Sequence, residues 1–238
     1  MKKLRNWDKK TWLSSSKYIS STINFLEKRI RFNKEIKILD IGCGRGKIIS
    51  TFSEKYQMSN FPVGIDIVDH KNTVRKINFI KINATKYLSK TKEKFDLILF
   101  KQSIHFFKFT EIKKILNSSK KILNSNGKII ILALHPKKNY WPLFKVFKIK
   151  LIQSLKKDEK ILNLIKFNFK EYKINYFIFK VKITKDSYLQ MIKNRFTSCL
   201  LDLSLRELKN GIDEIKKNYK KKLIFSDKLI CICYKKKS

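Results

Sequence analysis

The chain has 238 residues, with 56 lysines and arginines against 19 acidic residues, and its formal net charge is +37. Hydrophobic residues make up 43% and aromatic residues 13% of the sequence, which excludes an intrinsically disordered chain. The longest apolar run, Ile129 to Leu134, is far shorter than the about 20 residues of a membrane-spanning helix, so we expect a cytoplasmic protein without a membrane segment.

The predicted elements alternate between helices and strands through the first half of the chain. Amphipathic or turn-flanked segments predict helices at 14–31, 47–56, 85–88 and 110–123. Short apolar runs predict strands at 36–41, 61–67, 77–82, 95–100 and 128–134, with a turn at 124–127 before the last. This alternation indicates βαβ units and a parallel sheet with right-handed crossovers.

The pattern changes after Pro136, where helices prevail. Helices are expected at 141–154, 158–167, 187–201 and 204–219. A strand is expected at 176–183, with Phe177, Phe179, Val181 and Ile183 on one face, and further strand material at 223–234 around Ser226-Asp227. The first half therefore builds a sheet, and the second adds helices and final strands.

The excess of basic residues and the cysteines allow a simple interpretation. Seven of the 56 basic residues are arginines, and the lysines spread along the whole chain. This spread favours solvated lysine faces and leaves RNA or an anionic substrate as the alternative explanation of the charge. The four cysteines, at 43, 199, 231 and 233, contain no Cys-x-x-Cys pair, so we expect reduced, packed thiols and no metal site.

A glycine loop carries the strongest functional signal. Three of the six glycines fall within five residues, as Gly42, Gly44 and Gly46. They follow the strand at 36–41 and precede the helix at 47–56, so the backbone can turn tightly and let a ligand approach. A glycine turn between a strand and a helix N-terminus is the usual nucleotide site of an α/β sheet.

Two acidic residues beside the loop indicate which nucleotide binds there. The Gly-x-Gly-x-Gly spacing is not the Gly-x-Gly-x-x-Gly of dinucleotide folds, and Ile48 stands where a P-loop needs Ser or Thr. Asp40, directly before the loop, would repel a pyrophosphate but suits a cationic ligand such as the ammonium or sulfonium of S-adenosylmethionine. Asp66, 20 residues after Gly46 at the end of the next strand, can bridge ribose hydroxyls.

These residues resemble a known family. Ile38-Leu39-Asp40-Ile41-Gly42-Cys43-Gly44-Arg45-Gly46 is similar to motif I of the class I S-adenosylmethionine-dependent methyltransferases, in the small-molecule, type 11-like branch. Gly64-Ile65-Asp66 resembles the family's ribose contact, and Asn83-Ala84 stands where an Asp-Ala pair often contacts adenine. The amide oxygen of Asn83 would then accept a hydrogen bond from the adenine amino group. The segment from Phe95 to His105 resembles the fourth strand and the loop at the cofactor's reactive end, and the resemblance covers residues 34–135.

The resemblance implies a fold, a domain layout and a set of cofactor contacts. The fold is α/β, with a Rossmann-like, doubly wound, mostly parallel seven-stranded sheet, helices on both faces and a helical insertion near the C-terminus. One domain would span 1–238: an N-terminal helical cap at 1–33, a cofactor-binding core at 34–135, a helical, substrate-side insertion with one strand at 136–220, and a terminal strand with a lysine-rich tail at 221–238. The residues expected to bind S-adenosylmethionine are Asp40, Gly42, Cys43, Gly44, Gly46, Asp66, Ile67, Asn83, Ala84, Lys101 and Gln102.

The resemblance also suggests residues around the methyl acceptor. His105 is the candidate general base, with a structural role in its loop as the open alternative. The residues expected at the substrate are Trp12, His135, Tyr188 and Arg195. Trp7 would lie beside them and His70 near the adenosine. Arg195 would either clamp a substrate carboxylate or pair with Asp202 or Glu207.

The sequence thus predicts methyl transfer from S-adenosylmethionine to an O-, N- or C-nucleophile of a small molecule, by in-line attack on the sulfonium methyl. Such a transfer needs positioning and desolvation more than acid–base groups. Two alternatives stay open at this point. One is an RNA methyltransferase, which the charge of +37 would suit. The other is a cofactor-binding protein without transfer activity.

Overall fold

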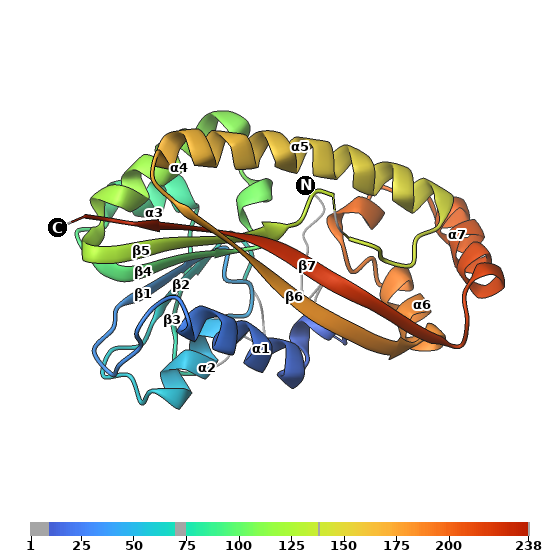
Figure 1. The fold of residues 1–238 in the computed structure, drawn as a ribbon, viewed down its shortest axis with the longest axis horizontal. Helices are drawn as coiled ribbons and strands as arrows, with labels where there is room; N and C mark the ends of the chain where they lie inside the picture. The colour runs from blue at the N-terminus through green and yellow to red at the C-terminus, as the bar shows by residue number, and fades with distance from the viewer. Residues whose placement is uncertain (1–9, 70–74, 138, 238) are drawn as a thin grey trace.

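One seven-stranded sheet, in the order β3-β2-β1-β4-β5-β7-β6, organises the computed structural model (Figure 1). The structure describes residues 10–69, 75–137 and 139–237, so Trp7 and His70 lie outside the described residues. The strands are β1 (Ile38–Ile41), β2 (Val63–Asp66), β3 (Asn78–Lys81), β4 (Phe95–Lys101), β5 (Leu123–Leu134), β6 (Lys173–Thr184) and β7 (Lys222–Lys235). Strand β7 runs antiparallel to its neighbours β5 and β6, and the pairs among β1 to β5 are parallel. The predicted α/β class and the mostly parallel seven-stranded sheet are confirmed.

Helices cover both faces of this sheet. They are α1 (Ser16–Glu27), α2 (Lys47–Lys55), α3 (Ala84–Lys90), α4 (Phe109–Lys121), α5 (Lys145–Phe169), α6 (Lys185–Lys193) and α7 (Leu205–Asn218), with short 3-10 helices η1 (Trp12–Ser14), η2 (Ile104–Phe106) and η3 (Ser198–Leu200). Side chains alternate along β4, so Leu97 and Leu99 pack in the core that contains α1 and α2. Ile98 and Phe100 pack in the opposite core, with α3, α4 and the second half of α5. No helix within the described ranges is long and apolar enough to cross a membrane.

Strand β5 is longer than predicted, because the expected turn lies inside it. Phe95 pairs with Leu123 and Leu97 pairs with Lys128, so residues 124–127 are skipped in the β4–β5 ladder. Asn126 has the left-handed φ of 63° that lets the strand bulge there. The Asn-Ser-Asn-Gly run therefore marks a bulge within the strand and not the end of the preceding helix.

Helix α5 corrects a second prediction, because 145–169 is one helix and not two. Residues 155–157, which separate the two expected helices, continue the helix with their side chains at least partly in solvent. Asp158 then keeps the buried stripe continuous with Leu151, Leu162 and Ile165. Figure 1 shows the helix passing along most of the molecule above the sheet.

Strands β6 and β7 continue past the rest of the sheet as a two-stranded ribbon. Pairing between β5 and β7 ends at Leu134 and Leu229, whereas β6 and β7 stay paired as far as Thr184 and Lys222. The ribbon therefore projects beyond the carboxyl ends of the parallel strands, and β7 continues unbroken through Ser226-Asp227. Of the stretch 136–220, α5 and β6 belong to the sheet and its covering helices, and α6, η3 and α7 connect β6 to β7 (Figure 1). The predicted one-faced alternation of β6 is present, because Phe177 and Val181 are buried and Ile178 is exposed.

The packing of α7 against the start of α5 depends on Gly211. A Cβ atom at this helical glycine would overlap the ring of Phe144, which is only 1% exposed. Glycine to alanine in a helix normally adds about 1 kcal/mol of stability. Here overpacking, which typically costs about 1–3 kcal/mol, opposes that gain.

We therefore expect Gly211→Ala to lower Tm by about 2–4 °C, equivalent to a net loss of about 1 kcal/mol for a chain of this size. Asn210→Ala is the matched control, since Asn210 is exposed on the same helix. It should leave Tm unchanged or raise it. Thermal unfolding of the two variants compares the effects, and an increase in Tm for Gly211→Ala would contradict the packing argument.

Candidate functional site

The glycine loop joins β1 to α2 at the carboxyl edge of the sheet. Gly42, Gly44 and Gly46 have left-handed φ values of 76°, 56° and 73°, which other residues adopt only with strain. The backbone N–H groups of Gly42 and Cys43 donate to the carbonyl of Ile65 at 2.8 and 3.1 Å, which ties the loop to β2. Gly46 then occupies the N-cap of α2. The loop predicted from the glycine spacing is therefore present with the expected geometry.

Two of these glycines are needed for different reasons. A Cβ at Gly42 would overlap the Ser103 side chain, whose hydroxyl donates to the carbonyl of Ile41 at 2.5 Å. A Cβ at Gly44 would meet no atom within 4 Å among the residues described. Gly42 thus allows the loop to pack against the segment after β4, whereas Gly44 borders open space.

The side chain of Cys43 points away from that open space. A Cβ at Gly64 would lie 2.9 Å from the Cys43 sulfur, so the thiol packs directly over β2. Burial, with Asp40 and Asp66 nearby, raises the pKa of this thiol well above its usual value. The thiol of Cys43 thus packs within the protein, and the predicted contact between Cys43 and the cofactor stays a prediction.

Asp66 stands at the end of β2 and faces the loop. Its carboxylate accepts hydrogen bonds from the backbone of Gly44 at 3.0 Å and of Val68 at 2.9 Å, one on each oxygen. Each oxygen keeps a further lone pair, so the group can still accept from ribose hydroxyls. The neighbouring Ile67 is 53% exposed, which leaves an apolar surface beside the acid.

Asp40 is the most unusual group of the loop. It is only 3% exposed, and its Oδ1 has no hydrogen-bond partner in the described part of the chain. Burial raises the pKa of Asp40 to about 7, with Lys101 opposing the shift and Asp66 adding to it. An unpartnered buried carboxyl is costly, and a cationic group bound beside it would satisfy it.

The side-chain oxygen of Asn83, which was expected to accept from adenine, already accepts hydrogen bonds within the protein. Its side-chain oxygen caps α3, accepting from the backbone of Thr85 at 2.8 Å and of Lys86 at 3.3 Å, and from the Thr85 hydroxyl. That oxygen is therefore engaged, and only the amide NH₂ group is left to donate to an adenine ring nitrogen. Ala84, the first residue of α3, is 4% exposed and packs in the core.

Taken together, the loop residues suit S-adenosylmethionine. The open space at Gly44, the acceptor oxygens of Asp66 and the unpartnered oxygen of Asp40 match a ligand with ribose hydroxyls and a positive charge. The two acids make this side of the loop unsuited to a pyrophosphate.

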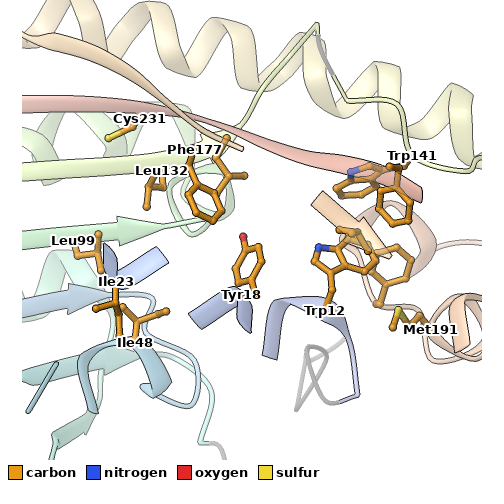
Figure 2. Packing of buried hydrophobic residues seen from close by; sticks show 14 of the residues in the cluster. Trp12, Tyr18, Ile23, Ile48, Leu99, Leu132, Trp141, Phe177, Met191 and Cys231 are labelled. Atoms are coloured by element: carbon orange, nitrogen blue, oxygen red, sulfur yellow. The ribbon is translucent and has the colours of Figure 1, made fainter. Parts of the chain in front are cut away.

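A buried polar cluster lies next to the loop, across the end of β4. Asp227 of β7 is fully buried and accepts a hydrogen bond from the indole N–H of Trp12 at 3.3 Å. Lys101 lies over the ring of Tyr18, 5.0 Å from its centroid, and its charge lowers the pKa of both Asp40 and Asp227 against the raising effect of burial. Figure 2 shows Tyr18 and Trp12 reaching into the core from the N-terminal segment. These contacts hold η1 and α1 against the sheet edge.

A small cavity of about 70 Å³ opens beside this cluster, past the end of β4. Its walls come from the loop around η2, from Trp141, from α5 and from the segment around η3. The lining residues are Leu13, Gln102, His105, Phe106, Leu134, Trp141, Leu151, Ser154, Asp158, Phe196, Thr197, Ser198 and Cys199. The cavity thus brings together the predicted residues Gln102 and His105 with α5 and η3.

His105 lies in η2 at this cavity, with its ring against Phe106 at 4.1 Å between centroids. Burial, and then the charge of Lys157, lower the pKa of His105 to about 4. The imidazole is therefore neutral near pH 7, a form that can accept a hydrogen bond or a proton but does so as a weak base.

The four residues expected at the substrate lie in different surroundings. Tyr188 is fully buried and its hydroxyl donates to the carbonyl of Pro142 at 2.6 Å, which fixes the segment that carries Trp141. His135 lies against Tyr176 at 5.5 Å between ring centroids and does not line the cavity. Arg195 donates to the carbonyls of Leu200 and Leu201, so it holds η3 and not a carboxylate. Trp12 packs on Trp141 at 5.6 Å between centroids, beside the cavity.

Among the described residues, Arg195 also forms no ion pair with Asp202 or Glu207, its two alternative partners. Glu207 is occupied by the N-cap Ser204 of α7, whose backbone N–H and hydroxyl both donate to it. The guanidinium instead donates to two carbonyl groups at the end of η3.

The sequence reasoning missed two buried acids, Asp158 and Asp227. Both interrupt an otherwise apolar pattern: Asp158 occupies the buried stripe of α5, and Asp227 lies between Phe225 and Leu229 on the inward face of β7. An acid at a position where the periodicity requires an apolar residue is a usable signal for a site, because burial of a carboxyl is otherwise unfavourable. The described residues contain no group of three or more His, Cys, Asp or Glu side chains that could hold a metal ion.

Comparison with known proteins agrees with this geometry. The methyltransferase domain family matches residues 12–158. A ubiquinone/menaquinone biosynthesis C-methyltransferase of Wigglesworthia glossinidia brevipalpis is 32% identical over 163 residues, a match that spans 63% of this chain and 61% of that protein.

Solved structures share the fold at low sequence identity. One of them is a protein of Anabaena variabilis described as a methyltransferase from an antibiotic biosynthesis pathway. It superposes with a TM-score of 0.64 and 13% identity, over 88% of this chain and 95% of its own. The plantazolicin methyltransferase BpumL, solved with a monoazolic desmethylPZN analogue and S-adenosylhomocysteine, gives a TM-score of 0.54 and 16% identity over 98% of this chain and 88% of its own.

Proposed function

Since the chain belongs to the class I S-adenosylmethionine-dependent methyltransferases, we propose that it transfers the methyl group of this cofactor to a small-molecule acceptor. When bound, the cofactor supplies a methyl group activated by a positively charged sulfur. The protein's own part is to hold the two reactants in line and to exclude water. We also propose that residues 1–238 act as one methyltransferase domain, and that the protein works in the cytoplasm, where its four free cysteines would stay reduced.

The unpartnered Oδ1 of Asp40 is the observation that carries the proposal. In our assignment Asp40 binds the cofactor's ammonium, and Asp66 accepts hydrogen bonds from the ribose hydroxyls. Ile67 covers one face of the adenine, and the Asn83 amide group donates to its edge. The backbone of Gly44 leaves the space in which the ligand lies, since no described atom occupies the position of a side chain there.

The cavity at the end of β4 supports a small acceptor. Its volume of about 70 Å³ suits a few heavy atoms, and it lies next to the loop from Lys101 to His105. Two similar proteins are named for small-molecule chemistry, the ubiquinone/menaquinone C-methyltransferase and the plantazolicin methyltransferase. In this assignment the neutral His105 orients the acceptor and takes up its proton where the acceptor loses one.

Calorimetric titration of S-adenosylmethionine and S-adenosylhomocysteine tests the cofactor assignment. We expect both to bind, and Asp66→Asn to weaken each about tenfold, because a hydrogen bond to a charged group contributes about 1.5–3 kcal/mol. Asp69→Asn, a nearby acid after β2, is the matched control and should leave the affinity within twofold. Unchanged affinity in Asp66→Asn would contradict the ribose contact, and no binding of either ligand would overturn the proposed function.

A further inference from the structure

Two residues that line the cavity at the end of β4 each have one buried polar atom that is unsatisfied. Asp158 is 7% exposed and Trp141 is 8% exposed. Within residues 10–69, 75–137 and 139–237, neither Oδ1 of Asp158 nor Nε1 of Trp141 has a hydrogen-bond partner. Both residues line the same cavity, one from α5 and the other from the segment after β5. Each unsatisfied buried group costs about 1–3 kcal/mol, so two at one cavity indicate a ligand that completes them.

The two atoms have opposite hydrogen-bonding character. A carboxylate oxygen only accepts, whereas an indole N–H only donates. A ligand that satisfies both must therefore present a hydroxyl or amine hydrogen to Asp158 and an acceptor atom to Trp141, and a carbonyl oxygen next to a hydroxyl group supplies both within a few atoms. Apolar side chains, among them Leu151 and Phe196, form other parts of the wall and leave room for only a small apolar body.

We propose that this cavity is the acceptor subsite and that it takes a hydroxycarbonyl group, with the hydroxyl on Asp158 and the carbonyl on Trp141. That the ligand is the methyl acceptor rests on the proposed function, but binding of a ligand to the cavity depends neither on the cofactor nor on turnover. Trp141 is held in place by the Tyr188 hydroxyl bond to Pro142 and by its edge contact with Trp12. Asp158 is held on a helix of 25 residues, so both groups are fixed before a ligand arrives.

The pH dependence of ligand binding to this cavity is expected to come from Asp158. Burial raises the pKa of Asp158 to about 6, and Lys157 opposes the shift. Of the other groups that line the cavity, the pKa of His105 is about 4 and the pKa of Cys199 is raised by burial. Between pH 5 and pH 8 the carboxyl of Asp158 is thus the group here that changes charge, and binding of a hydroxyl donor should strengthen as the pH rises through 6.

The test uses hydroxyacetone as the probe, with acetone and 2-propanol as probes that keep only the carbonyl or only the hydroxyl. The full-length protein, labelled with ¹⁵N-tryptophan, reports binding through the indole N–H signal of Trp141, which Trp141→Phe identifies. We expect hydroxyacetone to shift this signal at concentrations at least tenfold lower than either partial probe, since each lost hydrogen bond costs about 1 kcal/mol or more. Equal effects of the three probes would overturn the proposal.

Substitutions distinguish a loss of ligand binding from a loss of folding. Asp158→Asn should weaken hydroxyacetone about tenfold and remove the pH response, because an amide cannot ionise. Glu159→Gln is the matched control: Glu159 is the next residue of α5 and pairs with Lys137 at 3.3 Å, outside the cavity. Unchanged affinity in Asp158→Asn, in a variant whose Tm matches the wild type, would overturn the subsite.

Calorimetry of S-adenosylhomocysteine on the same samples distinguishes failure of the proposed function from failure of the subsite. Hydroxyacetone binding with no cofactor binding would overturn the proposed function and retain the cavity as a ligand site. Cofactor binding with no preference for hydroxyacetone would overturn the subsite alone.

Discussion

Asp40→Asn is expected to weaken S-adenosylmethionine binding about 100-fold at pH 8, because removing one partner of a buried charge pair costs about 2–5 kcal/mol. The wild-type affinity should itself depend on pH. The cofactor's cation favours the ionised carboxyl, whose pKa is about 7 in the free protein. Protonation therefore competes with binding below pH 7, and the dissociation constant should rise by up to about tenfold per pH unit on acidification.

Calorimetry from pH 6 to pH 8 measures this slope in both proteins. Ionisation of the ligand itself affects the affinity of both proteins equally, and the variant lacks only the Asp40 carboxyl. The difference between the two pH profiles is therefore due to Asp40. Parallel profiles would contradict the assignment of Asp40 to the cofactor's charge.

The stability of the free protein gives an independent check with the opposite sign. The folded pKa of Asp40 lies above its unfolded value of 3.8, so its stabilising contribution is complete below that value and is lost as the pH rises through 7. Asp40→Asn should therefore unfold at a higher temperature than the wild type at pH 8, and the gap should shrink towards pH 5. A variant that binds poorly because it is misfolded would instead melt lower.

Gly42→Ala and Gly44→Ala should separate stability from binding within one loop. Gly42→Ala adds left-handed strain of about 1–2 kcal/mol and overpacking of about 1–3 kcal/mol against Ser103. We expect a total loss of about 3 kcal/mol and a fall in Tm of about 6–12 °C. Gly44→Ala adds the strain alone, since its methyl group meets no described atom, and should lower Tm by about 2–8 °C.

The order of the two variants should reverse for the cofactor. The methyl group of Gly44→Ala projects into the space assigned to the ligand, so the affinity should fall at least tenfold, as expected when about 1.4 kcal/mol is lost. Thermal unfolding and calorimetry on both proteins provide the comparison. Equal losses of affinity at equal loss of stability would show that the loop responds as one unit.

The cofactor half was predictable because local chemistry determines it. The glycine spacing, the acid before the loop and the acid after the second strand are each a short-range pattern, and the structure brings Gly44 and Asp66 within 3.0 Å. Alternating strands and helices were equally readable, since both faces of the parallel strands are buried and the runs are strongly apolar.

The surroundings of the cavity at the end of β4 were less predictable because distant segments build them. Asp158 was expected only as the first residue of a helix and has charged neighbours on both sides, and the buried stripe of α5 shows that its side chain turns inward. Asp227 comes within 3.3 Å of Trp12 although 215 residues separate them. Arg195 and Tyr188 have side chains that could bind a substrate, but both donate hydrogen bonds to backbone carbonyls instead. No sequence pattern reveals these hydrogen bonds.

The position of β7 has a consequence for the order in which the protein can form. This strand follows every other strand in the chain, yet it lies between β5 and β6 in the sheet. Until β7 has been synthesised, β5 and β6 lack a shared partner, and Trp12 lacks Asp227. Such long-range pairing is slow and leaves strand edges exposed meanwhile. A nascent chain can therefore form β1, β2 and the glycine loop early, but Trp12 acquires its buried partner Asp227 only after β7 has been synthesised.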